Sequence, residues 1–405
     1  MSDSADITSD FFGPHVPAHL YVHVPFCASK CDYCDFASVA GADPDFVEVV
    51  FAGIRTQATT WSRSGLDGVV ETVYFGGGTP SLHPVQVLRT LAHIRSTLVV
   101  HPTAEITVEA NPDSLSPQTA AALAAQGVTR VSVGAQSFDD RILRVLGRRH
   151  DAAAASTACQ AVIDAGMDLS IDLMCGVPGQ TMTSWSETLS RAAATGAHHA
   201  SVYPLTIEEG TPMSAAVSAG LLAEPDSDEA ADMMVLAEEA LGYHGLSRYE
   251  VANYAESREH ESRHNTAYWT GRPYVGLGPG AHGMLDAATA RAVGLLSDVF
   301  EQDIARVRYG NAATIADWLV GRGDSIETLT HEEARREDVM LGMRLTKGVR
   351  QADVTAAGVT EVMTALEQDG LVELDDARRD NARWKTTRRG WLLGNEVFRK
   401  IWLGE

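Results

Sequence analysis

Three cysteines follow a short apolar segment in Tyr21–Cys34, which reads YVHVPFCASKCDYC. Cys27, Cys31 and Cys34 are spaced four and three residues apart, so their thiolates can converge from one loop onto a small polymetallic centre. Iron–sulfur clusters usually take four cysteines, so three would leave one iron open to a substrate or cofactor. The alternative is a zinc site with His23 as a fourth ligand, although structural zinc sites usually combine two separated pairs.

Strands and helices alternate on both sides of this loop. Six strands are predicted, at Leu20–Val24, Val69–Phe75, Glu105–Glu109, Arg130–Gly134, Leu169–Met174 and His199–Tyr203. Helices are predicted between or after them, at Phe46–Ser62, Pro84–Leu98, Ser116–Gln126, Ala152–Ala165 and Ser184–Thr195. Repeated βα units imply a parallel sheet of the α/β class. We therefore expect a partial (βα)6 barrel related to the TIM barrel, in which the chemistry lies on loops after strands.

The unusual segments of the chain occupy those loops. The cysteines follow the first predicted strand, Gly76–Gly78 the second, Glu109–Pro112 the third and Gly134–Gln136 the fourth. Since the carboxyl ends of parallel strands meet at one end of a barrel, these loops should converge on one mouth.

The regular alternation of predicted strands and helices ends after about residue 325. Helical stretches at Glu332–Leu345 and Val359–Asp369 precede a predicted hairpin, Leu371–Leu374 with Ala382–Thr387, and a last helix at Trp391–Trp402. This order resembles a winged helix of the α+β class. The expected organisation is a short segment 1–18, a barrel 19–250, a connecting segment 251–325 and a winged-helix-like domain 326–405.

Composition narrows the possible partners and the location. The 405 residues include 32 Lys and Arg against 54 Asp and Glu, a net charge of −22. An acidic chain repels phosphate backbones, so we expect no nucleic-acid partner. No apolar run approaches the ~18 residues of a membrane helix. Five cysteines, three of them within eight residues, favour metal or redox chemistry in a reducing cytoplasm over a disulfide framework.

The cysteine spacing is the CxxxCxxC motif of radical S-adenosylmethionine (SAM) enzymes. Further segments resemble the oxygen-independent coproporphyrinogen III oxidase family, namely Tyr21–Cys27, Phe75–Ser81, Gly134–Phe138, Leu146–His150, Ile171–Leu173 and Gly176–Thr181. The resemblance covers nearly the whole chain. It implies a [4Fe–4S] cluster on Cys27, Cys31 and Cys34, with SAM chelating the open iron through its amino and carboxylate groups.

The same resemblance implies a set of SAM contacts. Glycines allow a backbone to approach a ligand closely, arginine pairs with carboxylates, and carboxylates accept from amino or ribose hydroxyl groups. The candidates are Tyr21, Tyr33, Gly77, Gly78, Thr79, Glu109, Gln136, Arg148 and Asp172. A dinucleotide fingerprint at Gly276–Ala281 is rejected, because it lies late in the chain, contains a proline and lacks a helix after a clear strand. Cys159 and Cys175 lie in apolar surroundings and should be buried.

Two departures separate the chain from the true oxidases. Their motif continues to a fourth cysteine where this chain has Phe36, and their long N-terminal arm is expected to be missing because the cysteines begin at residue 27. Both features resemble the HemW-like branch, whose members are regarded as heme chaperones. Coproporphyrinogen III decarboxylation and radical SAM chemistry on another substrate remain the alternatives.

His264–Trp269 reads HNTAYW and resembles the HNxxYW motif of that branch. His264 offers an axial ligand to heme iron, and Tyr268 and Trp269 offer ring faces to a porphyrin. Arg263 and Arg272 are near enough in sequence to reach propionates. The expected function is therefore heme binding and delivery to heme-accepting proteins, possible acceptors including those at the inner face of the membrane, by a monomer or weak dimer.

Overall fold

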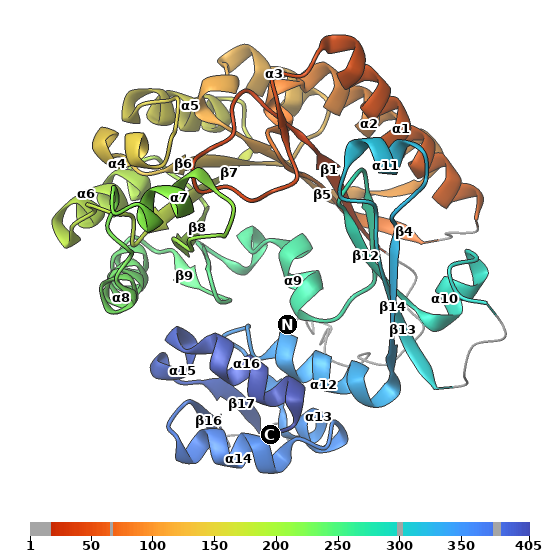
Figure 1. The fold of residues 1–405 in the computed structure, drawn as a ribbon, viewed down its shortest axis with the longest axis vertical. Coiled ribbons are helices and arrows are strands. Elements are labelled where there is room, and N and C mark those ends of the chain that lie inside the picture. Colours follow the sequence, from red (N-terminus) through yellow and green to blue (C-terminus); the bar gives the residue numbers. More distant parts are fainter. Residues whose placement is uncertain (1–17, 65–67, 298–302, 376–381) are drawn as a thin grey trace, which may run out of the picture.

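The computed structural model describes residues 18–64, 68–297, 303–375 and 382–405, so the expected segment 1–18 lies almost wholly outside it. In the described chain, a 12-stranded sheet runs in the order β14-β13-β12-β11-β1-β4-β5-β6-β7-β8-β10-β9. The two ends of this order are not paired with each other, so the sheet curves without closing (Figure 1).

The six predicted barrel strands are confirmed, parallel and in chain order. They are β1 (His19–Val24), β4 (Val69–Gly77), β5 (Val99–Ala110), β6 (Arg130–Gln136), β7 (Asp168–Cys175) and β8 (His199–Pro204). Most residues of these strands are buried, because helices cover one face and other side chains fill the opposite one. That burial explains the nearly continuous β-branched runs in the sequence.

Helices cover the outer face of the sheet (Figure 1). The larger ones are α1 (Pro44–Arg63), α2 (Pro84–Thr97), α3 (Pro117–Ala125), α5 (Ala152–Asp164), α6 (Met182–Ala193) and α8 (Ser227–Tyr243). α1 begins where the Asp43 carboxylate accepts the N–H of Asp45, with Pro44 in the first turn. Phe51 and Ile54 of α1, Leu91 of α2 and Trp185 of α6 are buried against the strands and form the core.

The sheet extends beyond the predicted barrel at both edges. β11 (Tyr274–Leu277) pairs in parallel with β1, and β12 (His282–Asp286), β13 (Ile304–Gly310) and β14 (Ser325–Thr330) follow in antiparallel order. β10 (Asn253–Ala255) and β9 (Ser247–Arg248) extend the opposite edge. β11 ends at Leu277, directly before Gly278. β12 follows instead of a helix, so the dinucleotide fingerprint remains rejected.

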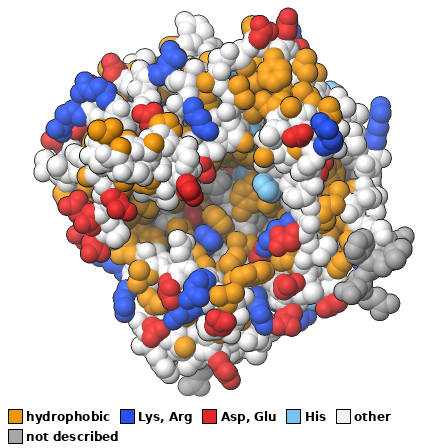
Figure 2. Space-filling view, in the orientation of Figure 1, with side chains coloured by type: hydrophobic (Ala, Val, Ile, Leu, Met, Phe, Trp, Pro, Cys, Tyr) orange, Lys and Arg blue, Asp and Glu red, His pale blue; other side chains and the backbone are white. Residues whose placement is uncertain are grey.

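Short elements complete the barrel region. They are β2 (Phe26–Cys27), β3 (Val39–Ala40), α4 (Asp140–Val145), α7 (Pro212–Ser218), α9 (Arg263–Trp269), α10 (Ala287–Ala292) and α11 (Ile315–Leu319). α9 lies on the inner side of the curved sheet, facing the C-terminal helices (Figure 1). Figure 2 shows that this side of the molecule is hollowed near its centre, with hydrophobic side chains around the hollow.

The C-terminal region has its own core. It contains α12 (His331–Gly342), β15 (Val349–Arg350), α13 (Gln351–Ala356), α14 (Thr360–Gln368), β16 (Val372–Asp375), β17 (Arg383–Thr386), α15 (Arg388–Leu392) and α16 (Gly394–Leu403). β16 and β17 form the predicted hairpin, whereas the predicted last helix is divided into α15 and α16. Met363, Leu366, Trp384 and Ile401 are buried together. Among the described residues, no helix is long and apolar enough to cross a membrane.

Candidate cluster and cofactor site

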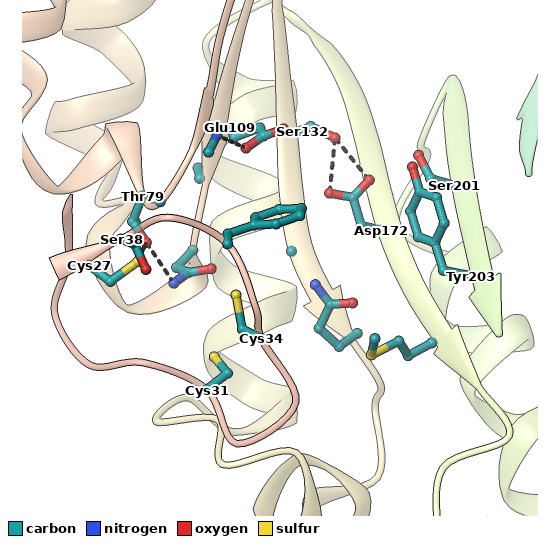
Figure 3. Close-up of a pocket in the computed structure, with 18 of the residues that line it drawn as sticks. Cys27, Cys31, Cys34, Ser38, Thr79, Glu109, Ser132, Asp172, Ser201 and Tyr203 are labelled. Carbon is teal, nitrogen blue, oxygen red and sulfur yellow. Dashed lines mark hydrogen bonds between the residues drawn. The ribbon is translucent and has the colours of Figure 1, made fainter. Parts of the chain in front are cut away.

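A cavity of about 380 Å³ opens at the carboxyl ends of the barrel strands. Its walls come from the loop after β1, from β4 to β8 and from the start of α9, so segments far apart in sequence meet there (Figure 3). The structure brings together these predicted residues: Cys27, Cys31, Cys34, Tyr33, Gly77, Gly78, Thr79, Glu109, Gln136, Arg148 and Asp172. The expected convergence on one mouth is therefore observed.

The three cysteines lie on the loop between β1 and α1. β2 and β3 pair within this loop, which holds Cys27 opposite Ala40. The three thiols are partly exposed, and none forms a disulfide. Figure 3 shows the sulfur atoms of Cys27, Cys31 and Cys34 around one end of the cavity. Burial raises the pKa of the Cys34 thiol, so a bound metal would be needed to favour its thiolate form.

Polar side chains contact two of the sulfur atoms. The Thr79 hydroxyl donates to Cys27 Sγ at 3.7 Å, and the guanidinium of Arg148 donates to Cys31 Sγ at 3.4 Å. Arg148 also donates to Asn111 Oδ1 at 2.6 Å and to the Gly134 carbonyl at 2.7 Å, which fixes its direction. A cation beside a sulfur favours the thiolate that metal ligation requires.

The glycines after β4 allow the strand end to pack against the cysteine loop. Gly77 has φ +106°, a conformation that side chains disfavour, and its N–H donates to Glu109 Oε2 at 3.0 Å. A Cβ on Gly78 would lie 2.5 Å from the Phe26 carbonyl oxygen, so the two segments could not approach as they do. These glycines thus bring backbone to the cavity edge beside Cys27.

Two partly buried carboxyls lie on the strand side of the cavity, away from the cysteines (Figure 3). Burial raises the pKa of Glu109 to about 7, although the Tyr74 hydroxyl donates to it at 2.8 Å. Burial also raises the pKa of Asp172 to about 6, although Ser132 donates to it at 3.0 Å. Each carboxylate is suited to accept hydrogen bonds from an amino or hydroxyl group, since such bonds would offset its desolvation.

Gln136 occupies a strained position at the end of β6. Its φ of +63° is unusual for a residue other than glycine, and its side chain lines the cavity. Strain of this kind concentrates at functional sites. Gln136 thus shares the cavity with the three cysteines and Asp172.

This donor set fits a cluster and SAM. In a [4Fe–4S] cluster, the three thiols on this loop would leave one iron without a cysteine ligand. The neighbouring backbone, carboxyls and Arg148 match the polar groups of an amino-acid nucleoside. Tyr21 is not among the residues facing this cavity; it lines a second one. The first cavity is also lined by residues that the sequence did not predict, namely Asn111, Ser132, Ser201 and Tyr203. Asn111 could have been found, because it directly follows β5.

His264 lies on α9, away from the cysteines, and is 1% exposed. Its Nδ1 is 2.8 Å from the Thr72 hydroxyl, and its Nε2 is 2.8 Å from the Tyr268 hydroxyl. Its ring stacks on Tyr74, whose hydroxyl reaches Glu109. Burial holds the pKa of His264 well below its usual range, so the imidazole is neutral. The buried ring thus packs α9 against Tyr74 of β4.

The remaining residues proposed for heme lie in different environments. Trp269 contacts the C-terminal domain, where the Arg344 guanidinium lies 5.0 Å from its ring centre. Arg263 pairs with Glu71 at 3.2 Å and donates to the Thr103 carbonyl at 3.1 Å. The backbone N–H of Arg272 donates to the Ala267 carbonyl at 2.9 Å, but its guanidinium has no hydrogen bond or ion pair with a described residue. The structure therefore brings His264 and Tyr268 together and places Trp269 elsewhere.

Comparisons with known proteins identify two domains and close relatives. Residues 21–192 match the Radical SAM superfamily, and residues 329–393 match the HemN C-terminal domain. The heme chaperone HemW of Mycobacterium tuberculosis is 34% identical over 401 residues, covering 96% of this chain and 95% of its own. The heme chaperone HemW of Bacillus subtilis is 31% identical over 392 residues, covering 95% of this chain and 99% of its own.

A solved structure has the same fold. Coproporphyrinogen III oxidase (HemN) from Escherichia coli, a radical SAM enzyme, superposes with a TM-score of 0.75 over 96% of this chain and 91% of its own. Sequence identity in that pair is 19%, so the likeness concerns the fold alone. The predicted α/β radical SAM fold is thereby confirmed.

Proposed function

Because the chain belongs to the heme chaperone HemW family, we propose that it binds heme and delivers it to acceptor proteins, and that it carries a [4Fe–4S] cluster and SAM. The observation that carries the proposal is the similarity to HemW proteins over 96% of the chain, combined with three thiols gathered at the mouth of the barrel.

Cys27, Cys31 and Cys34 would hold the cluster, and SAM would bind the iron that lacks a cysteine. When bound, such a cluster can supply an electron and SAM an electrophilic sulfonium. Arg148 balances charge beside Cys31, at 3.4 Å. Glu109 and Asp172 would accept from the amino and ribose hydroxyl groups of SAM, with Tyr74 and Ser132 holding them in place. The space for SAM would also be lined by Gly77, Gly78, Thr79, Gln136 and Tyr33.

The HNxxYW segment would contact heme. His264 supplies an imidazole and Tyr268 a ring face, but both ring nitrogens of His264 are hydrogen-bonded in this structure. Ligation of iron by Nε2 therefore requires that Tyr268 move. Trp269 would act by attaching α9 to the C-terminal domain through Arg344.

Titration of anaerobically reconstituted protein with hemin tests the function. We expect a shift of the Soret band at stoichiometric hemin in the parent, and weaker binding in His264→Ala with the Fe–S absorbance intact. His93→Ala is the matched control, because this imidazole is also hydrogen-bonded, to Thr59 at 2.8 Å, on the outer helices. A parent protein that leaves the hemin spectrum unchanged would refute heme binding.

A further inference from the structure

A second cavity, of about 290 Å³, lies on the inner face of the sheet where β1, β11 and β12 meet α9. It shares Gly77 and Phe36 with the cluster cavity, so the two are neighbours. Tyr268 of the HNxxYW helix forms one wall, and His282, the first residue of β12, lies at another. The cavity therefore joins the proposed heme segment to a histidine outside that segment.

His282 differs from the other histidine of this cavity. His23 is buried, with Nδ1 3.1 Å from the Tyr21 hydroxyl and Nε2 3.0 Å from the Ala37 carbonyl. His282 is exposed, and neither of its ring nitrogens is hydrogen-bonded to a described residue. Its cross-strand neighbour is Gly310, whose missing side chain leaves room for the ring. Its imidazole lone pair can therefore reach a ligand without breaking a bond.

The other walls are aromatic. Tyr21, Tyr268 and Tyr274 line the cavity, and the rings of the last two meet edge to face with centres 4.6 Å apart. Phe36 stands at the boundary with the cluster cavity and is 57% exposed. Phe36 and the three tyrosines thus line one cavity, and contiguous apolar surfaces of this kind mark ligand-binding grooves. A flat apolar ring with a metal at its centre matches these walls.

We infer that heme enters this second cavity and that His282 is the side chain that first ligates its iron. The inference rests on the proposed function and adds a ligand outside the HNxxYW segment. The cavity is open to solvent, so the propionates can stay in water while one ring face packs on the tyrosines. Partial enclosure suits a protein that must release its heme.

The geometry also sets the order in which the two histidines would ligate the heme iron. Tyr268 both lines this cavity and hydrogen-bonds His264 Nε2 at 2.8 Å. Heme seated against Tyr268 would be one side chain away from His264, which becomes a ligand when the tyrosine moves. His282 is thus the docking ligand, available in the structure as it stands.

Hemin titration of the reconstituted full-length protein tests the assignment. We expect His282→Ala to bind hemin at least about tenfold more weakly than the parent and to alter the Soret position. His282→Gly should regain the parent spectrum when free imidazole is added. His244→Ala is the matched control, because this imidazole is also exposed and has no hydrogen bond to a described residue, but it lies in neither cavity.

Circular dichroism, iron content and the SAM response of the cluster show whether each variant is folded. Equal hemin affinity and an equal Soret band in a folded His282→Ala would overturn the assignment and leave the HNxxYW proposal standing. Equal losses in His244→Ala and His282→Ala would overturn it in favour of nonspecific surface binding. A parent protein that binds no hemin would refute the proposed function together with this inference.

Discussion

The Nε2 atom of His264 lies 2.8 Å from the hydroxyl of Tyr268, one helical turn further along α9. The spacing i, i+4 places both side chains on one face of the helix. The hydroxyl of Thr72 lies 2.8 Å from the other ring nitrogen of His264, Nδ1. The histidine is therefore held in a closed arrangement, and release of its bond to Tyr268 is the smallest change that would expose a nitrogen.

Tyr268→Phe should bind hemin about 2- to 12-fold more tightly than the parent. A hydrogen bond contributes a net of roughly 0.5–1.5 kcal/mol, and the variant need not break this one before His264 reaches iron. Tyr274→Phe is the control, since its ring lines the same cavity without a hydrogen bond to a described histidine. Hemin affinity that is equal or weaker in Tyr268→Phe would count against ligation by His264.

The cluster prediction concerns metal content. Anaerobically reconstituted protein should hold about four irons per chain, and Cys27→Ala, Cys31→Ala or Cys34→Ala should abolish the Fe–S absorbance. Cys159→Ala and Cys175→Ala should retain it, because both thiols are buried and burial raises the pKa of each to about 12. Iron analysis and visible spectra measure both results. Colourless protein with stoichiometric zinc would contradict the cluster.

The barrel and its mouth could be predicted from the sequence because their signals are local. Strands buried on both faces are continuous apolar runs, and helices begin at residues such as Asp43 and Pro44. Parallel strands place their carboxyl ends together, so loops such as those holding Cys31 and Glu109 had to meet. β11 was missed because it spans four residues, includes Gly276 and is stabilised by pairing with β1.

The environment of the HNxxYW segment could not be predicted, because it depends on distant partners. Thr72 is 192 residues before His264, and Glu105, which accepts the backbone N–H of His264 at 3.0 Å, is 159 residues before it. The sequence motif supplied the residue types but not their directions. The position of Trp269 against Arg344 likewise depends on how the C-terminal domain packs.

Decarboxylation of coproporphyrinogen III should be absent. Phe36 occupies the position where the true oxidases have a fourth cysteine, and its ring is exposed between the two cavities. Anaerobic incubation with coproporphyrinogen III, SAM and a reductant should yield no protoporphyrinogen by chromatography. The Escherichia coli oxidase provides the positive control, and cluster content must be intact. Product formed over several turnovers would favour the oxidase alternative.

SAM affinity should increase as the pH rises through about 6. Burial raises the pKa of Asp172 from 3.8 to about 6, so the carboxyl of the folded protein is mostly neutral only below that pH. Ribose hydroxyls of SAM that donate to Asp172 would favour its ionised form. Below about pH 6, SAM can therefore bind in this way only if Asp172 first loses its proton, which weakens binding. Isothermal titration of SAM between pH 5 and 8 measures this slope. Asp172→Asn should bind more weakly with a smaller slope, the remainder being due to Glu109, whose pKa is about 7.

The Asp172 carboxyl should also make the stability of the protein depend on pH. Stability should fall as the pH rises, whereas SAM affinity should increase. Between about pH 4 and 6 the folded protein retains a proton that the unfolded chain loses, so the contribution of Asp172 is present below pH 4 and is lost as the pH rises through 6. In the absence of SAM, Asp172→Asn should therefore be more stable than the parent at pH 8, on the order of 1 to 2 kcal/mol. The difference should shrink toward pH 4. Denaturant unfolding at both pH values, with Asp164→Asn on the outer helix α5 as control, measures it. A stability difference that does not change with pH would contradict the assigned role of burial.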